Sequence, residues 1–74
     1  MQYYLTDEPR SGTLLAGAFD AIDQVYGTAP FTDEQAVKAI TTVISVGTLE
    51  ATSLFKDLVG KGYITASTPG LSPD

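Results

Sequence analysis

The sequence predicts one small α+β domain, mostly α, with three helices packed against a two-stranded antiparallel sheet. Three internal segments repeat apolar residues at helical spacing, and a short run of strand-forming residues stands at each end of the 74-residue chain. Because an isolated strand is not stable, we expect the two terminal strands to pair with each other. The domain is expected to span residues 1–68, followed by a frayed tail at 69–74.

The first predicted element is a strand at residues 2–6, QYYLT, which stops at the acidic turn 7–9. Side chains alternate along a strand, so Tyr3 and Leu5 share one face and Tyr4 takes the other. A tyrosine that is exposed beside an open strand edge is a natural contact point for a protein. The simpler alternative is that each ring lies along the helices or is solvated.

The first helix is predicted at residues 11–26, with Ser11 or Thr13 as its N-cap and Gly27 at its C-terminal end. Two acidic residues, Asp20 and Asp23, lie one turn apart on this helix. They are candidates for acid–base or cation chemistry, but a solvated helix face explains them more simply. The apolar stripe of the helix consists of Leu15, Ala18, Phe19, Ile22, Val25 and Tyr26.

The second helix has the clearest start signal, because Thr32 can cap it and Gln35 completes a capping box. Asp33 and Glu34 then lie in the first turn, where the helix dipole favours negative charge; this explains them better than a metal site does. The helix is expected to end by residues 46–47. Its inward positions are Val37, Ile40, Val43 and Ile44.

A third helix is expected to start with Thr48 as its cap and to end at Gly60 or Gly62. A strand at residues 63–68 follows. The predicted stripe of this helix consists of Ala51, Leu54, Phe55 and Leu58, with Leu49 and Val59 flanking it.

Residues 32–66 resemble a winged-helix or winged helix-turn-helix domain. A capped helix is followed by the tight link 46–47, and then by the segment LFKDLVGKGYI at residues 54–64. In that family the equivalent leucines seat the recognition helix on the core, and the glycine with the following apolar pair turns the chain into the wing. The second wing strand is missing here or replaced by the N-terminal strand. The resemblance implies a winged-helix-like core of three helices.

Composition and charge limit the function. The chain has no cysteine and no histidine, so disulfides, the usual zinc sites and thiol or Ser–His nucleophiles are excluded, and we expect no enzyme, cofactor or metal. Nine carboxylates against four cations give a net charge of −5, which disfavours phosphate backbones and anionic lipid. No apolar run approaches the ~20 residues of a membrane span, and no signal peptide is evident, so a cytoplasmic location is expected.

Two functions are compatible with these observations. The first is a non-enzymatic interaction module that binds a protein partner or forms a homodimer, through the surface of helix 48–59 and through Tyr3, Tyr4 and Val59. The alternative is a DNA-binding transcriptional regulator. In that case the phosphate contacts would come from Lys38, Lys56 and Lys61, and the base contacts from Thr52 and Ser53. The alternative is the weaker one, because a useful phosphate footprint needs about six cations or more.

Overall fold

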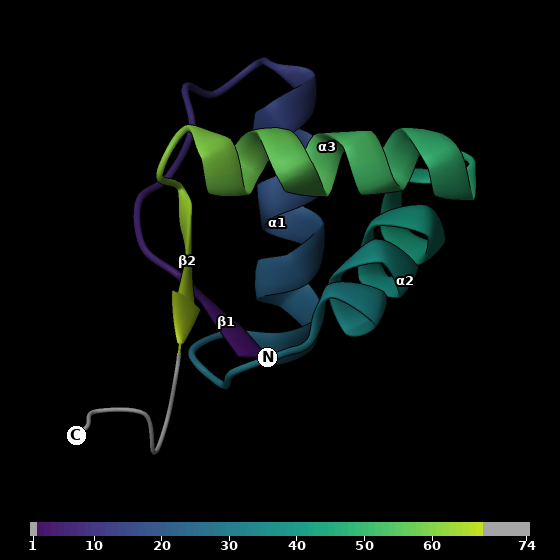
Figure 1. Ribbon diagram of the computed structural model, residues 1–74. Coiled ribbons are helices and arrows are strands. Elements are labelled where there is room, and N and C mark those ends of the chain that lie inside the picture. The colour runs from purple at the N-terminus through teal and green to yellow at the C-terminus, as the bar shows by residue number, and fades with distance from the viewer. Residues whose placement is uncertain (1, 68–74) are drawn as a thin grey trace, which may run out of the picture.

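A computed structural model describes residues 2–67 of the chain (Figure 1). The element order is β1 (Gln2–Leu5), α1 (Leu14–Tyr26), α2 (Asp33–Ile44), α3 (Thr48–Gly60) and β2 (Ile64–Ser67). The predicted fold class, α+β and mostly α with paired terminal strands, is confirmed. The expected tail at 69–74 and the last residue of the expected domain, Thr68, lie outside the described residues. No helix between residues 2 and 67 is long and apolar enough to cross a membrane.

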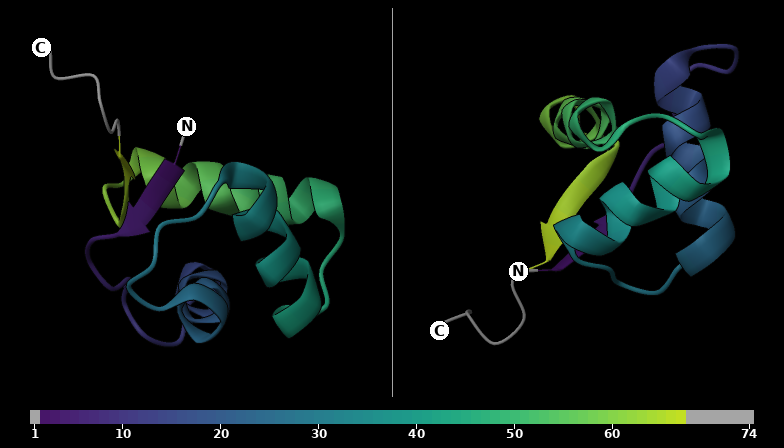
Figure 2. Two further views of the ribbon diagram at one scale, coloured as in Figure 1. Left: turned by 90° about the horizontal axis from the view of Figure 1, so that it is seen from below. Right: turned by 90° about the vertical axis from the view of Figure 1, so that its right-hand side faces the viewer.

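The sheet joins the two ends of the chain. β1 and β2 are antiparallel, in a register that runs from the pair Gln2 and Ser67 to the pair Leu5 and Ile64. On its other edge β1 forms a bridge with Phe31, where the Tyr3 N–H donates to the Phe31 carbonyl at 2.7 Å and the Phe31 N–H donates back at 3.0 Å. β1 therefore lies between β2 and the segment that leads into α2, to one side of the three helices (Figure 2).

The core consists of apolar side chains from all three helices and the sheet. Among residues 2–67, no polar or charged side chain is buried. Small residues occupy much of the contact between helices, which allows the helices to approach one another closely. The fully buried alanines are Ala18, Ala21, Ala36 and Ala51. The largest fully buried side chains are Phe31, Ile22, Ile40, Leu58 and Ile64.

The helix starts follow the sequence signals in two of three cases. The Thr13 hydroxyl caps α1, and Thr32 and Gln35 form the predicted capping box of α2. The prediction that Thr48 caps α3 is wrong, because Gly47 is the N-cap and Thr48 is the first helical residue. The reason lies in the link: Ser45 adopts a left-handed conformation, and Gly47 is already extended at the position of a cap.

The end of α3 agrees with the prediction that a glycine terminates it. The Tyr63 N–H donates to the Leu58 carbonyl at 2.9 Å, and the Gly62 N–H donates to the Val59 carbonyl at 3.1 Å. This pair of bonds is a Schellman motif, and it needs a residue with positive φ, which Gly62 supplies at 86°. The motif directs the chain out of α3 and into β2.

Two predicted core positions are wrong. Val25 in the last turn of α1 is 51% exposed, and Val43 in the last turn of α2 is 37% exposed. Both lie at the edge of their apolar stripes by angle around the helix, and the residues that follow them, Tyr26 and Ile44, still pack against the core. Leu49, which flanks the α3 stripe, is 88% exposed in the first turn of its helix. Periodicity therefore identified the buried face of α1 and α2 and overestimated its width.

Candidate functional site

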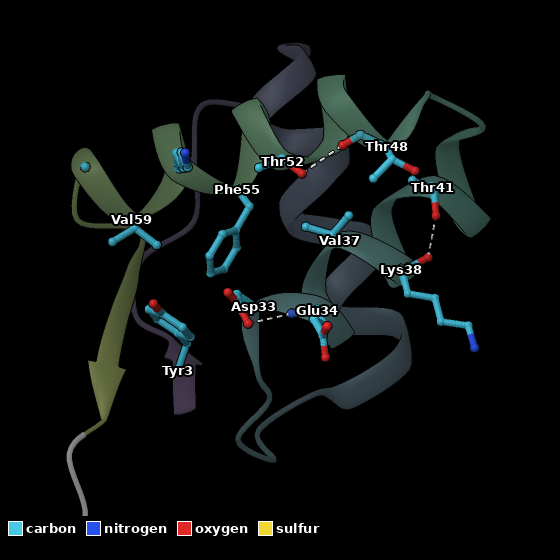
Figure 3. Close-up of a pocket in the computed structure, with 12 residues that line it drawn as sticks. Tyr3, Asp33, Glu34, Val37, Lys38, Thr41, Thr48, Thr52, Phe55 and Val59 are labelled. Carbon is cyan, nitrogen blue, oxygen red and sulfur yellow. Dashed lines mark hydrogen bonds between the residues drawn. The ribbon is translucent and has the colours of Figure 1, made fainter. Parts of the chain in front are cut away.

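A groove between α2 and α3 has a volume of about 710 Å³ (Figure 3). The two helices diverge from the short link at residues 45–47, and Tyr3 of β1 closes the wide end of the groove (Figures 1 and 3). Thr41 and Thr48 line the narrow end beside the link. We call this surface the α2–α3 groove.

The floor of the α2–α3 groove is apolar and belongs to the core. Phe55 is 5% exposed, and Tyr3 meets it edge-on with a ring-centroid distance of 4.9 Å and an interplanar angle of 89°. Val37 and Val59 lie beside these rings and are half-buried. Edge-to-face contacts of this kind stabilise both rings beyond the effect of their buried area, so the two rings of the floor hold each other in place.

Three threonines line this part of the groove, and two of them, Thr41 and Thr52, already use their hydroxyl hydrogens. The Thr52 hydroxyl donates to the Thr48 carbonyl at 2.8 Å, and the Thr41 hydroxyl donates to the Lys38 carbonyl at 2.9 Å. Both bonds return to the helix that carries the threonine. These side chains therefore present methyl groups and acceptor oxygens to the groove, and they have no free donor there.

The charges at the rim cancel. Asp33 and Glu34 lie in the first turn of α2, Lys38 lies one turn later, and Lys56 stands on the α3 side. The chain as a whole has four cations and nine carboxylates, so the residues outside the groove, with two cations and seven carboxylates, carry the entire net charge of −5. The α2–α3 groove is a neutral surface on an acidic protein.

The groove brings together residues that the sequence assigned to two different functions. Tyr3 and Val59 were candidates for protein contact, whereas Lys38, Thr52 and Lys56 were candidates for DNA contact. All five line the same groove. Sequence reasoning did not recognise that they share one surface, because the angle between α2 and α3 creates the groove and no local pattern encodes that angle.

The remaining candidates lie elsewhere. Ser53 and Lys61 are exposed and do not line the groove. Lys61 follows the last residue of α3, and its N–H donates to the Asp57 carbonyl at 2.9 Å. Tyr4 is 42% exposed on the other face of β1, as the alternation predicted. Three of the five predicted DNA contacts, Lys38, Thr52 and Lys56, therefore line the groove. The other two, Ser53 on α3 and Lys61 just after it, lie on the exposed surface outside the groove.

Several residues of the groove were not predicted as site residues. Phe55 and Val37 were assigned to the core by their helical spacing, and both also form the groove floor. Glycine at position 60 lines the groove as well, where it leaves room because an added Cβ would have no atom within 4 Å. The one feature of the sequence that pointed to this surface was Val59, an apolar residue beside the predicted stripe of α3.

Tyr4 lines a second hollow, of about 590 Å³, on the other face of β1. Its charged lining residues are Asp7, Glu8 and Asp23, and no cation lines it. Within residues 2–67 no group of three or more carboxylates is arranged to hold a metal ion. This hollow is an acidic surface, in contrast to the neutral groove.

Comparison with known proteins gives no match, whether to a family model, a curated protein or a solved structure. Fold alone does not determine function, because one scaffold supports many sites. The functional interpretation therefore depends on the chemistry of the α2–α3 groove.

Proposed function

We propose that this chain is a non-enzymatic protein–protein interaction module on a winged-helix-like scaffold, and that it binds its partner in the α2–α3 groove. The observation that carries the proposal is the preformed apolar floor of Tyr3, Val37, Phe55 and Val59 under a charge-balanced rim. Aromatic and aliphatic residues at the centre of a groove with polar residues at its edge are typical of a surface that receives a side chain or a helix of another protein.

The winged-helix-like part of the proposal is supported by the connections around α3. A link of three residues, 45–47, joins α2 to α3, and Gly62 turns the chain into β2. In a winged helix the next element would be a second wing strand paired with β2. β1 pairs with β2 in that place, antiparallel, which favours replacement of the missing wing strand by the N-terminal strand. A cytoplasmic location is part of the same proposal.

The DNA-binding function is the second candidate, and the groove chemistry disfavours it. The two lysines at the rim are matched by two carboxylates, and the Thr52 hydroxyl donates to its own helix. In a gel shift on mixed DNA at about 50 mM salt we expect no complex at protein concentrations of tens of micromolar, because so few cations release few counterions. A clear shift that Lys56→Glu abolishes would replace the proposal with the DNA-binding function.

A crosslinking experiment tests the proposal itself. A photo-reactive amino acid is placed in the cell-expressed protein at position 52, inside the groove, and separately at position 53, on the exposed side of α3. We expect protein adducts, identified by mass spectrometry, at position 52 and few at position 53. Equal adducts at both positions, or none at position 52, would contradict binding in the groove.

Gly60 offers a matched pair of variants for the same experiment. A Cβ added at Gly60 meets no atom within 4 Å, and this helical glycine lacks positive φ, so a side chain can start there without a clash. Gly60→Trp should fill the groove and remove the adduct at position 52. Gly60→Ala should keep the adduct, and it should stabilise the helix slightly because alanine is the better helix former.

A further inference from the structure

We infer that the partner in the α2–α3 groove is a second copy of this chain, bound in a symmetric dimer. The inference rests on the proposed function and names the partner of that same site. It is carried by the arrangement of charges along the groove, by the contrast with the rest of the surface, and by the apolar floor.

The charged residues Glu34 and Lys38 of α2 can pair with the same two residues of a second copy. Glu34 and Lys38 lie on the α2 side of the groove, with the Lys38 side chain extending away from the floor (Figure 3), and they are four residues and therefore about 6 Å apart along the helix axis. In a two-fold dimer each contact occurs twice, since residue i of one copy meets residue j of the other and the reverse. When two α2 helices lie antiparallel across the axis, Glu34 of each copy faces Lys38 of the other.

The same two-fold axis brings the apolar floors together. Val37 lies between the two charged positions in sequence and on the groove surface, so it comes close to the axis. Tyr3 and Val59, which are half-buried in the single chain, would lose their remaining contact with water. Burial of apolar area is the main favourable contribution to such an association.

Charge also decides against other faces of the molecule. The groove lining is neutral, whereas the rest of the chain carries the whole net charge of −5, so two copies that meet at their grooves avoid bringing the acidic parts of their surfaces together. The hollow beside Tyr4 has three lining carboxylates and no lining cation, so two such surfaces repel. A second acidic copy is accommodated best where its own charges cancel, which is at the α2–α3 groove.

The test uses two charge reversals and sedimentation velocity of the purified full chain. The wild type should sediment as a dimer at concentrations of hundreds of micromolar. Lys38→Glu leaves only acids at positions 34 and 38, and Glu34→Lys leaves only lysines. Each variant alone should dimerise at least tenfold more weakly, because symmetry repeats the like-charge contact.

Mixing the two variants is the decisive step. In an equimolar mixture every contact between positions 34 and 38 again joins a carboxylate to an ammonium group, so a heterodimer should form where neither variant dimerises alone. Each reversal also places like charges four residues apart within one helix, which destabilises that helix by roughly 0.2–0.5 kcal/mol. Mixing cannot repair an effect inside one chain, so recovery of the dimer reports the contact between chains.

Glu50→Lys is the matched control, since Glu50 is an exposed carboxylate of α3 outside the groove lining. It should leave dimerisation unchanged within about twofold, and circular dichroism should show all variants folded. The inference would be overturned if the wild type stayed monomeric, if neither charge reversal weakened dimerisation, or if the mixture of the two variants stayed monomeric. If adducts at position 52 then identify another protein, the proposed function still stands. If no adduct forms at position 52 either, both the dimer inference and the proposed function fail.

Discussion

Tyr3 and Tyr4 are neighbours on one strand, yet they belong to two surfaces with different chemistry. Tyr3 packs on Phe55 at the end of the α2–α3 groove, whose charges cancel. Tyr4 lies in a hollow of similar size whose charged lining residues are all acidic. Both surfaces are concave, so concavity alone does not single out the groove as the proposed docking surface. The neutral charge and the preorganised apolar floor distinguish the groove.

The largest effect is expected from the groove floor itself. Phe55→Ala removes a ring that is 5% exposed and in edge contact with Tyr3, so it should lower the free energy of unfolding by about 3–5 kcal/mol. A domain of this size has only a few kcal/mol of stability. We therefore expect the variant to be largely unfolded by circular dichroism at 25 °C. A variant that melts within a few degrees of the wild type would show that Phe55 does not support the floor.

The two tyrosines provide a direct contrast. Tyr3→Ala should lower the free energy of unfolding by about 2 kcal/mol, because it removes a half-buried ring and its aromatic contact. Tyr4→Ala should change it by no more than about 0.5 kcal/mol, as expected for an exposed residue. Urea unfolding of both variants measures the difference. If both variants lost the same free energy of unfolding, Tyr3 would contribute no more to stability than the exposed Tyr4 on the other face of β1.

A smaller effect is expected at the helix starts that border the groove. Thr32→Ala removes the hydroxyl of the α2 capping box and should cost about 1 kcal/mol. Thr48→Ala should be close to neutral in urea unfolding, because Gly47 is the cap of α3 and the Thr48 hydroxyl makes no capping bond. If Thr48→Ala lowered the free energy of unfolding more than Thr32→Ala, Thr48 would be the cap of α3, as the sequence predicted.

Local signals account for most of the fold that the sequence predicted. The spacing of Leu54, Phe55 and Leu58 identified the buried face of α3, and the pair Thr32 and Gln35 located the start of α2, because both signals act within one or two helical turns. The pairing of the terminal strands followed from the absence of any other partner in the sequence.

Features that depend on the packing of whole elements were not predicted. The exposure of Val25 and Val43 depends on how much of the width of each helix a neighbouring element covers, since the next residues, Tyr26 and Ile44, pack against the core. The bridge from Tyr3 to Phe31 joins backbone groups that carry no sequence signature. The groove arises from the divergence of α2 and α3, so Lys38 and Val59 could be identified singly as candidates but not placed on one surface.

The proposed binding of a protein in the α2–α3 groove can be tested directly. The most direct measurement is the ratio of adduct yields from a photo-crosslinker at position 52 and one at position 53, which are adjacent in sequence but differ in that only Thr52 lines the groove. If the partner binds in the groove, we expect a ratio of about ten or more, reduced to about one by Gly60→Trp and maintained in Gly60→Ala. A ratio near one in the wild type would contradict binding in the groove.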